Sequence, residues 1–168
     1  MLRNIEIKVR CRDLSAVRER AVAARAEDRG TLLQTDTFYH SAAGRLKLRE
    51  IAGDHAELIW YARDDVAGSK RSDYVVSLIA DPLTLHAALE QSNGTRGVVR
   101  KRRDLFLWRN VRIHLDAVQG LGDFVELESV VGEVHEATAS ANLDELLGLL
   151  GLTGSQVVAV AYADLLQL

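Results

Sequence analysis

The pattern of apolar and polar positions predicts a first strand over residues 4–12. Its side chains lie on two faces, because successive residues of a strand point in opposite directions. One face carries Ile5, Ile7, Val9 and Cys11, and the other carries Asn4, Glu6, Lys8, Arg10 and Arg12. Alone, this is typical of a strand with one face in water. Paired charges recur on later strand-like runs, at Lys47 and Arg49, Lys101 and Arg103, Arg112 and Asp116, and Glu126 and Glu128. Repeated pairing of this kind indicates a charged interior.

Further elements follow from the same patterns and from turn and cap residues. Strands are predicted at 32–40, 45–51, 57–63, 74–79, 98–103, 105–109, 111–117 and 123–131, with 64–72 as a loop. Helices are predicted from Asp13 to about 27, from Asp81 to about 91 with Pro82 at the first helical position, at 134–150 and at 156–166. Many antiparallel strands with few helices predict an α+β fold, a closed or nearly closed β-barrel.

Length and composition narrow the class of protein. The 168 residues fit a single domain spanning 1–168. Without a long apolar run or a signal-peptide pattern, and with Cys11 as the single cysteine, the chain is expected to be cytoplasmic and free of membrane contact. The basic block 100–103 suggests nucleic-acid binding, but the apolar residues that follow it favour a strand. A solvated basic edge remains an alternative.

Glu126 and Glu128 form the first candidate site. On one strand face they lie about 7 Å apart and repel each other unless a cation lies between them. Spacing alone favours exposure of both to water. The functional alternative is a site for Mg²⁺ or Mn²⁺, which prefer oxygen ligands, with Glu6 as a third ligand. His114 alternates with polar residues and could line such a site, although a structural histidine is favoured.

Cations on the predicted strands form the second candidate site. They are Arg45, Lys47, Arg49, Arg63, Lys101, Arg103 and Arg112. Such residues can simply protect the outer edges of a sheet. Alternatively they form a cradle for a polyanion, because guanidinium groups match phosphate oxygens and lysine supplies a point charge. Carboxylates and cations together suggest a metal-bound phosphate chain.

Several runs together resemble the CYTH family of triphosphate tunnel proteins. Residues 4–8 are similar to its Glu-x-Glu-x-Lys motif, and 99–103 to its Val-x-Lys-x-Arg strand. Residues 34–39, 44–49, 58–63 and 162–166 match further blocks, and 112–128 is the most specific stretch. Each motif alone is common, whereas their joint occurrence in this order over nearly the whole chain is specific.

The resemblance implies a tunnel of about eight antiparallel strands with flanking helices. It implies that metal is held by Glu6, Glu126 and Glu128, with Asp116 near them, and that phosphates are held by Lys8, Lys47, Arg49, Arg63, Lys101, Arg103 and Arg112. Catalysis is expected to depend on Glu6, Lys8, Arg49, Glu126 and Glu128. Family members include class IV adenylyl cyclases, thiamine triphosphatases and inorganic triphosphatases. Asn4 departs from the pattern, because the family has glutamate there.

The leading functional hypothesis is a Mg²⁺- or Mn²⁺-dependent phosphohydrolase acting on a triphosphate. One alternative is a class IV adenylyl cyclase, and another is a module that binds triphosphate or polyphosphate without turnover. The expected ligand is tripolyphosphate, thiamine triphosphate or ATP. Nucleic acid is disfavoured as a partner, and a homodimer stays open.

Overall fold

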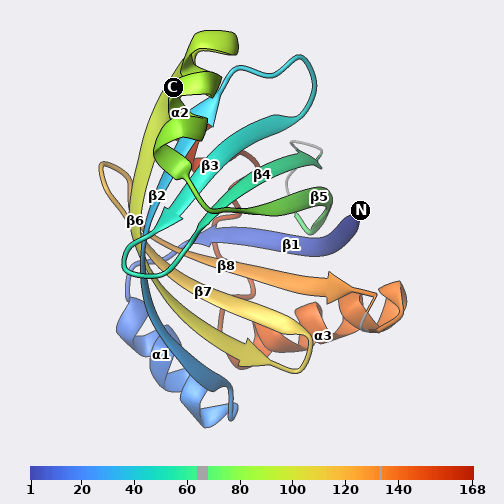
Figure 1. The fold of residues 1–168 in the computed structure, drawn as a ribbon. Helices are drawn as coiled ribbons and strands as arrows, with labels where there is room; N and C mark the ends of the chain where they lie inside the picture. Colours follow the sequence, from blue (N-terminus) through green and yellow to red (C-terminus); the bar gives the residue numbers. More distant parts are fainter. Residues whose placement is uncertain (64–67, 133) are drawn as a thin grey trace.

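The structure, a computed structural model, describes residues 1–63, 68–132 and 134–168. The described residues form eight strands that close into a barrel in the order β1-β5-β4-β3-β2-β6-β7-β8, with every neighbouring pair antiparallel (Figure 1). They are β1 (Leu2–Arg10), β2 (Glu27–Tyr39), β3 (Arg45–Ile51), β4 (Ala56–Arg63), β5 (Lys70–Ile79), β6 (Thr95–Trp108), β7 (Val111–Val118) and β8 (Gly122–Val131). The predicted α+β barrel is confirmed.

Four helices accompany the barrel in the described part of the chain. They are α1 (Leu14–Ala23), α2 (Pro82–Ser92), α3 (Glu136–Leu149) and α4 (Tyr162–Leu165). The predicted caps are present, since the side chain of Asp13 accepts from Ala16 N at 3.0 Å and that of Asp81 from Thr84 N at 3.1 Å. No helix within the described ranges has both the length and the apolar character that a membrane span requires.

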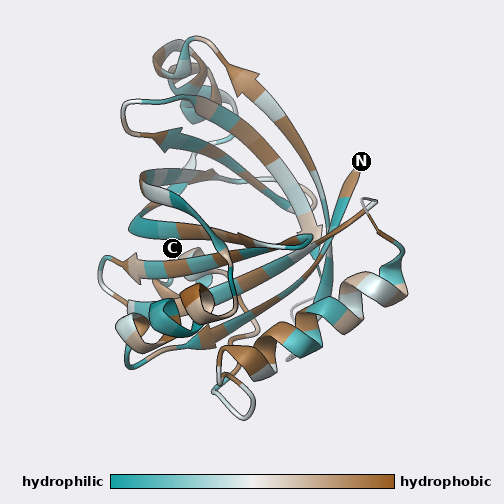
Figure 2. Ribbon diagram, turned by 90° about the horizontal axis from the view of Figure 1, so that it is seen from below, coloured by the Kyte–Doolittle hydropathy of each residue, from teal (hydrophilic) through white to brown (hydrophobic). Residues whose placement is uncertain are grey.

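The main hydrophobic core lies outside the barrel, where α1 and α3 cover β1, β7 and β8. Ile7 of β1, Ile113 of β7 and Leu127 of β8 pack there against Val17 of α1 and Leu143 of α3. Hydrophilic and hydrophobic residues alternate along the strands (Figure 2). Because the apolar side chains of these strands are used on the outer face, their polar side chains are turned into the barrel.

Four parts of the prediction differ from the structure. The strands predicted at 98–103 and 105–109 are one strand, β6, because Asp104 continues the ladder opposite Leu115. The helix predicted at 156–166 is only α4; before it, Val157 bridges Val9 in an extended segment. In the predicted loop 64–72, residues 64–67 lie outside the described residues, and 70–72 begin β5. The first predicted helix is also shorter, because β2 already begins at Glu27.

Candidate functional site

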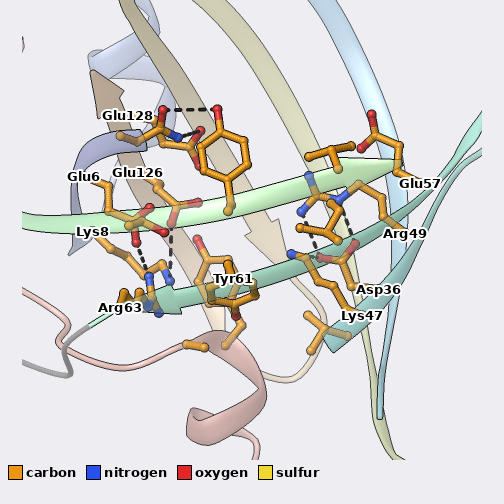
Figure 3. Close-up of a pocket in the computed structure, with 18 of the residues that line it drawn as sticks. Glu6, Lys8, Asp36, Lys47, Arg49, Glu57, Tyr61, Arg63, Glu126 and Glu128 are labelled. Carbon is orange, nitrogen blue, oxygen red and sulfur yellow. Dashed lines mark hydrogen bonds and ion pairs between the residues drawn. The ribbon is translucent and has the colours of Figure 1, made fainter. Parts of the chain in front are cut away.

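The barrel encloses a cavity of about 190 Å³ whose walls are mostly charged (Figure 3). All seven cations predicted to bind phosphate line it, namely Lys8, Lys47, Arg49, Arg63, Lys101, Arg103 and Arg112. The carboxylates in its lining are Glu6, Asp36, Glu57, Glu126 and Glu128. The structure therefore brings together charged residues from seven of the eight strands, and three of the four predicted metal ligands are among them.

The basic block 100–103 is divided by the alternation of β6. Lys101 and Arg103 are buried in the barrel, whereas Arg100 and Arg102 are exposed on its outer surface. The outer surface of β6 therefore carries only half of the charge that the sequence suggests for nucleic-acid binding.

Glu126 lies between two cations and one imidazole because of the strand register. On β8 it is opposite Lys8 of β1 and His114 of β7. Its Oε2 accepts from Arg103 Nη2 at 2.9 Å, and its Oε1 is 3.5 Å from Lys8 Nζ. Burial alone would raise the pKa of Glu126, but Lys8 and Arg103 hold that pKa well below its usual range. The carboxylate is thus ionised and paired.

Glu128 and Glu6 are also paired with cations. Glu128 Oε2 is 3.1 Å from Arg112 Nη2, and Glu6 forms an ion pair with Arg63, which reaches across from β4. Burial and the negative charge of Glu126 raise the pKa of Glu6. Repulsion between the carboxylates, expected from their spacing, is therefore offset by a cation at each one.

His114 faces the same two carboxylates. Its Nδ1 is 3.7 Å from Glu126 Oε2 and 3.7 Å from Glu128 Oε1, too far for hydrogen bonds. Only 4% of the residue is exposed, and Nδ1 has no hydrogen-bond partner among the described residues. Burial, and then the charge of Arg103, lowers the pKa of His114. One ligand atom from each of these three residues lies within 4.8 Å of the others.

Asp116 lies behind the cavity wall and, like His114, is not part of the lining found for the described residues. It is fully buried and accepts from Arg103 Nε at 2.7 Å and Arg103 Nη2 at 2.6 Å, and from Tyr162 Oη at 2.8 Å. In this arrangement Asp116 orients Arg103. Its predicted role as a metal ligand stays a prediction, and its contacts point to an indirect role.

The other side of the cavity is a cationic group built around Asp36, a residue to which the sequence pattern assigned no role. Lys47 Nζ donates to Asp36 Oδ2 at 2.8 Å, and Arg49 Nε donates to Oδ1 at 2.8 Å. Figure 3 shows this group and the group with Glu6 and Glu126 on either side of Tyr61. The sequence signal that could have identified Asp36 was its position in β2. It lies two residues from Gln34 and from Phe38, both buried, and residues two apart on a strand share a face.

Tyr162 is a second residue of the site to which the sequence pattern assigned no role. Its ring lies beneath two cavity lysines, 4.0 Å from Lys8 Nζ and 5.0 Å from Lys101 Nζ. Cation–π contacts of this kind stabilise a desolvated ammonium group. Lys8 Nζ also approaches Val160 O at 3.5 Å, so the C-terminal segment holds this lysine in place.

Asn4 is buried next to Arg112 and Glu128. In the amide orientation that satisfies both of its polar atoms, its oxygen accepts from Arg112 Nη2 at 3.0 Å. Asn4 thus lines the cavity beside Glu128, and its neutral side chain leaves one fewer negative charge there.

The buried lysines predict how stability depends on pH. All four lysines of the chain are buried. Burial, and then the charge of a neighbouring arginine, lowers the pKa of Lys47 to about 8 and that of Lys101 to about 7, whereas an unfolded lysine titrates near about 10.4. Between these values the unfolded chain binds more protons than the folded one. The contribution of these two lysines to the free energy of unfolding is therefore expected to rise from about pH 7 to about pH 10.

Urea unfolding measured at several pH values tests this prediction, with Lys47→Arg as the matched variant. Arginine keeps the charge beside Asp36 but does not titrate. The rise above about pH 8 should therefore be smaller in the variant. Identical pH profiles for the two proteins would show that Lys47 does not carry the shifted pKa.

Comparisons with known proteins agree with this architecture. The model of the CYTH domain matches residues 2–162. The PH1012 protein of Pyrococcus horikoshii OT3 superposes with a TM-score of 0.85 at 20% identity, covering 96% of this chain and 98% of that one. A protein from Vibrio parahaemolyticus described as a candidate adenylate cyclase gives 0.78 at 18% identity, covering 98% of each chain.

A third similar structure is a Hippeastrum protein, described as a candidate adenylyl cyclase with a dominant triphosphatase activity. It has a TM-score of 0.65 at 18% identity and covers 94% of this chain and 91% of that one. A search of curated proteins finds no match. The structural similarities, all at low identity, concern the fold, whereas the family model covers nearly the whole chain. This chain belongs to the CYTH family.

Proposed function

We propose that this protein is a divalent-metal-dependent phosphohydrolase that binds a triphosphate inside its barrel. The observation that carries the proposal is the cavity wall, in which seven cations and five carboxylates face one enclosed space. Burial of so much charge costs free energy, and binding of a ligand of complementary charge would offset that cost. A phosphate chain carries many negative oxygens, and arginine and lysine are the side chains that bind them.

The size of the cavity supports a phosphate chain as the buried part of the ligand. Its volume of about 190 Å³ is below the roughly 300 Å³ at which pockets for drug-sized ligands begin. An organic group attached to the triphosphate would therefore extend toward the opening. This favours hydrolysis of the chain over cyclisation of a nucleotide, which would require the base and ribose to be bound as well.

The carboxylates fit a divalent ion by their chemistry. Glu126, Glu128 and Glu6 supply the oxygen donors that Mg²⁺ and Mn²⁺ prefer. When bound, such an ion neutralises charge on phosphate oxygens and so lowers the energy of a phosphoryl-transfer transition state. In the structure the same carboxylates are paired with Lys8, Arg103, Arg112 and Arg63.

These existing ion pairs suggest how the chain's own residues would act. If the carboxylates bound a divalent ion, Lys8 and Arg103 would be released from them and could contact phosphate oxygens. Asp116 and Tyr162 would keep Arg103 and Lys8 oriented during this exchange. Positioned cations in a site that excludes water stabilise developing negative charge without further reorganisation.

A product screen tests the proposal. Purified protein is incubated with tripolyphosphate, thiamine triphosphate or ATP, with Mg²⁺, Mn²⁺ or chelator, and products are separated by ion-exchange chromatography. We expect metal-dependent release of orthophosphate from at least one substrate. Cyclic AMP with pyrophosphate would instead identify a cyclase. Tight binding of all three compounds without any product would identify a binding module.

A further inference from the structure

We propose that His114 Nδ1 is a direct ligand of the divalent ion, together with one oxygen each from Glu126 and Glu128. The site would then take a first-row transition ion such as Mn²⁺ in preference to Mg²⁺. This inference rests on the proposed function, because it concerns the metal of that same site. It replaces the oxygen-only ligand set expected from the sequence with a mixed nitrogen and oxygen set.

The distances fit one ion among the three residues. Nitrogen and oxygen donors lie about 2.1 Å from small divalent ions, so two donors that subtend 90–120° are roughly 3.0–3.6 Å apart. The two separations from Nδ1, both 3.7 Å, lie just above this range, and the three donor atoms lie within 4.8 Å of one another. Small rotations of the glutamate side chains would bring all three donors into contact with a common ion.

The environment of the His114 side chain is the second observation. Its Nδ1 is enclosed, aimed at two carboxylates, and without a hydrogen-bond partner in the described part of the chain. Buried polar atoms are rarely left unpaired, and those that are require an explanation. A ligand position supplies one, because an ion between Nδ1 and the carboxylates would satisfy this nitrogen.

Glu6 is less suited than His114 to complete this set in the structure. Its carboxylate is engaged by Arg63, whereas His114 faces the pair from the neighbouring strand β7. Figure 3 shows Glu126 and Glu128 on the same side of the cavity. Arg103 and Lys8 also contact Glu126, and Arg112 contacts Glu128, so an ion would compete with these three cations.

The donor set determines the choice of ion. Mg²⁺ requires near-octahedral oxygen coordination and loses its waters reluctantly. Imidazole nitrogen suits first-row transition ions, and the affinity of a given site for them increases from Mn²⁺, the weakest of the series, toward Cu²⁺. A histidine ligand should therefore strengthen binding of Mn²⁺ much more than binding of Mg²⁺.

Pulsed electron paramagnetic resonance on the Mn²⁺-loaded wild-type protein tests the ligand directly. We expect modulation from one directly bound ¹⁴N nucleus, replaced by a ¹⁵N signal when the protein is made with ¹⁵N-histidine. His114→Gln should abolish the nitrogen signal. His55→Gln is the matched control, since His55 also lies beside two carboxylates, 3.0 Å from Asp54 and 3.1 Å from Glu57, but is partly exposed. The control should retain the signal.

Calorimetric titration of the same proteins gives a second readout. His114→Gln is expected to weaken Mn²⁺ binding by more than about 10-fold, because loss of even an outer-shell partner of a ligand costs about 10- to 100-fold, with a much smaller effect on Mg²⁺. Mn²⁺ that binds at the tunnel without a nitrogen signal would overturn the inference and leave the proposed function standing. A protein that binds neither ion would overturn both. The wild-type spectrum decides the question even if the His114 variant does not fold.

Discussion

Glutamine in place of Glu126 is expected to lower metal-dependent triphosphate turnover about 100- to 1,000-fold, the range seen when one preorganised electrostatic contact is lost from an active site. The amide keeps the size of the side chain but removes the charge that would hold the ion. It also removes the charge that pairs with Lys8 and Arg103. Initial rates over a range of Mn²⁺ concentrations measure the effect.

Binding measurements separate this loss from misfolding. With the carboxylate gone, Lys8 and Arg103 are free to contact phosphate, so Glu126→Gln should bind metal-free tripolyphosphate at least as tightly as the wild type. Its affinity for Mn²⁺ should fall. Asp73→Asn is the matched control, because Asp73 is an ion-paired carboxylate on β5 but lies outside the barrel. Full activity in Glu126→Gln would remove this residue from the metal site.

Asp36→Asn is expected to cause the largest loss of stability. Asp36 is 2% exposed and is the shared anion for Lys47 and Arg49. Loss of one partner from a buried ion pair typically costs about 3–5 kcal/mol, because a charge is left buried without compensation. Urea unfolding of the metal-free protein measures this cost. The exposed pair of Asp73 with Arg3 should contribute little to the free energy of unfolding, because solvent screens it.

Tripolyphosphate should reverse much of the effect of Asp36→Asn. The phosphate chain would supply the negative charge that the variant lacks, and a ligand that binds only the folded state stabilises it. The rise in melting temperature on adding tripolyphosphate should therefore be larger for Asp36→Asn than for the wild type. An equal or smaller rise would show that the ligand does not contact Lys47 and Arg49.

The alternation of side chains along single strands carried most of the successful sequence prediction. It placed Glu6 and Lys8 on one face, and it separated Lys101 from the exposed Arg102. The apolar residues that alternate with them pack on the outer face of the barrel, under the helices. The polar residues of the same strands therefore face the interior of the closed barrel. The position of the charged residues inside the barrel follows from that pattern, whereas the order of the strands comes from the structure.

Contacts that depend on register between distant strands could not be predicted in this way. Asp36 meets Arg49 because β2 and β3 pair in one register, and His114 meets Glu126 because β7 and β8 do. The position of Tyr162 under Lys8 depends on how the C-terminal segment returns to the barrel. None of these relations has a signal within a short stretch of sequence.

Local propensity also gave way to tertiary structure. Residues 156–161 were expected to be helical, but Val158 N donates to Lys8 O at 2.8 Å in an extended segment beside β1. The valines at 157 and 158 favour extended structure, and the strand edge supplies their hydrogen bonds. A break between two strands was likewise expected at Asp104, but β6 continues through it. The Asp104 side chain is paired there with Arg18 and Thr31.

The positions of the bound ion and phosphate chain are the decisive test of a triphosphate site inside the barrel. Crystals grown with Mn²⁺ and tripolyphosphate would be measured at a wavelength where manganese scatters anomalously. We expect a manganese peak beside Glu126 and Glu128, and a phosphate chain inside the barrel in contact with Lys47, Arg49 and Lys101. Manganese and phosphate found only on the outer surface, for example at Arg100 and Arg102, would contradict it.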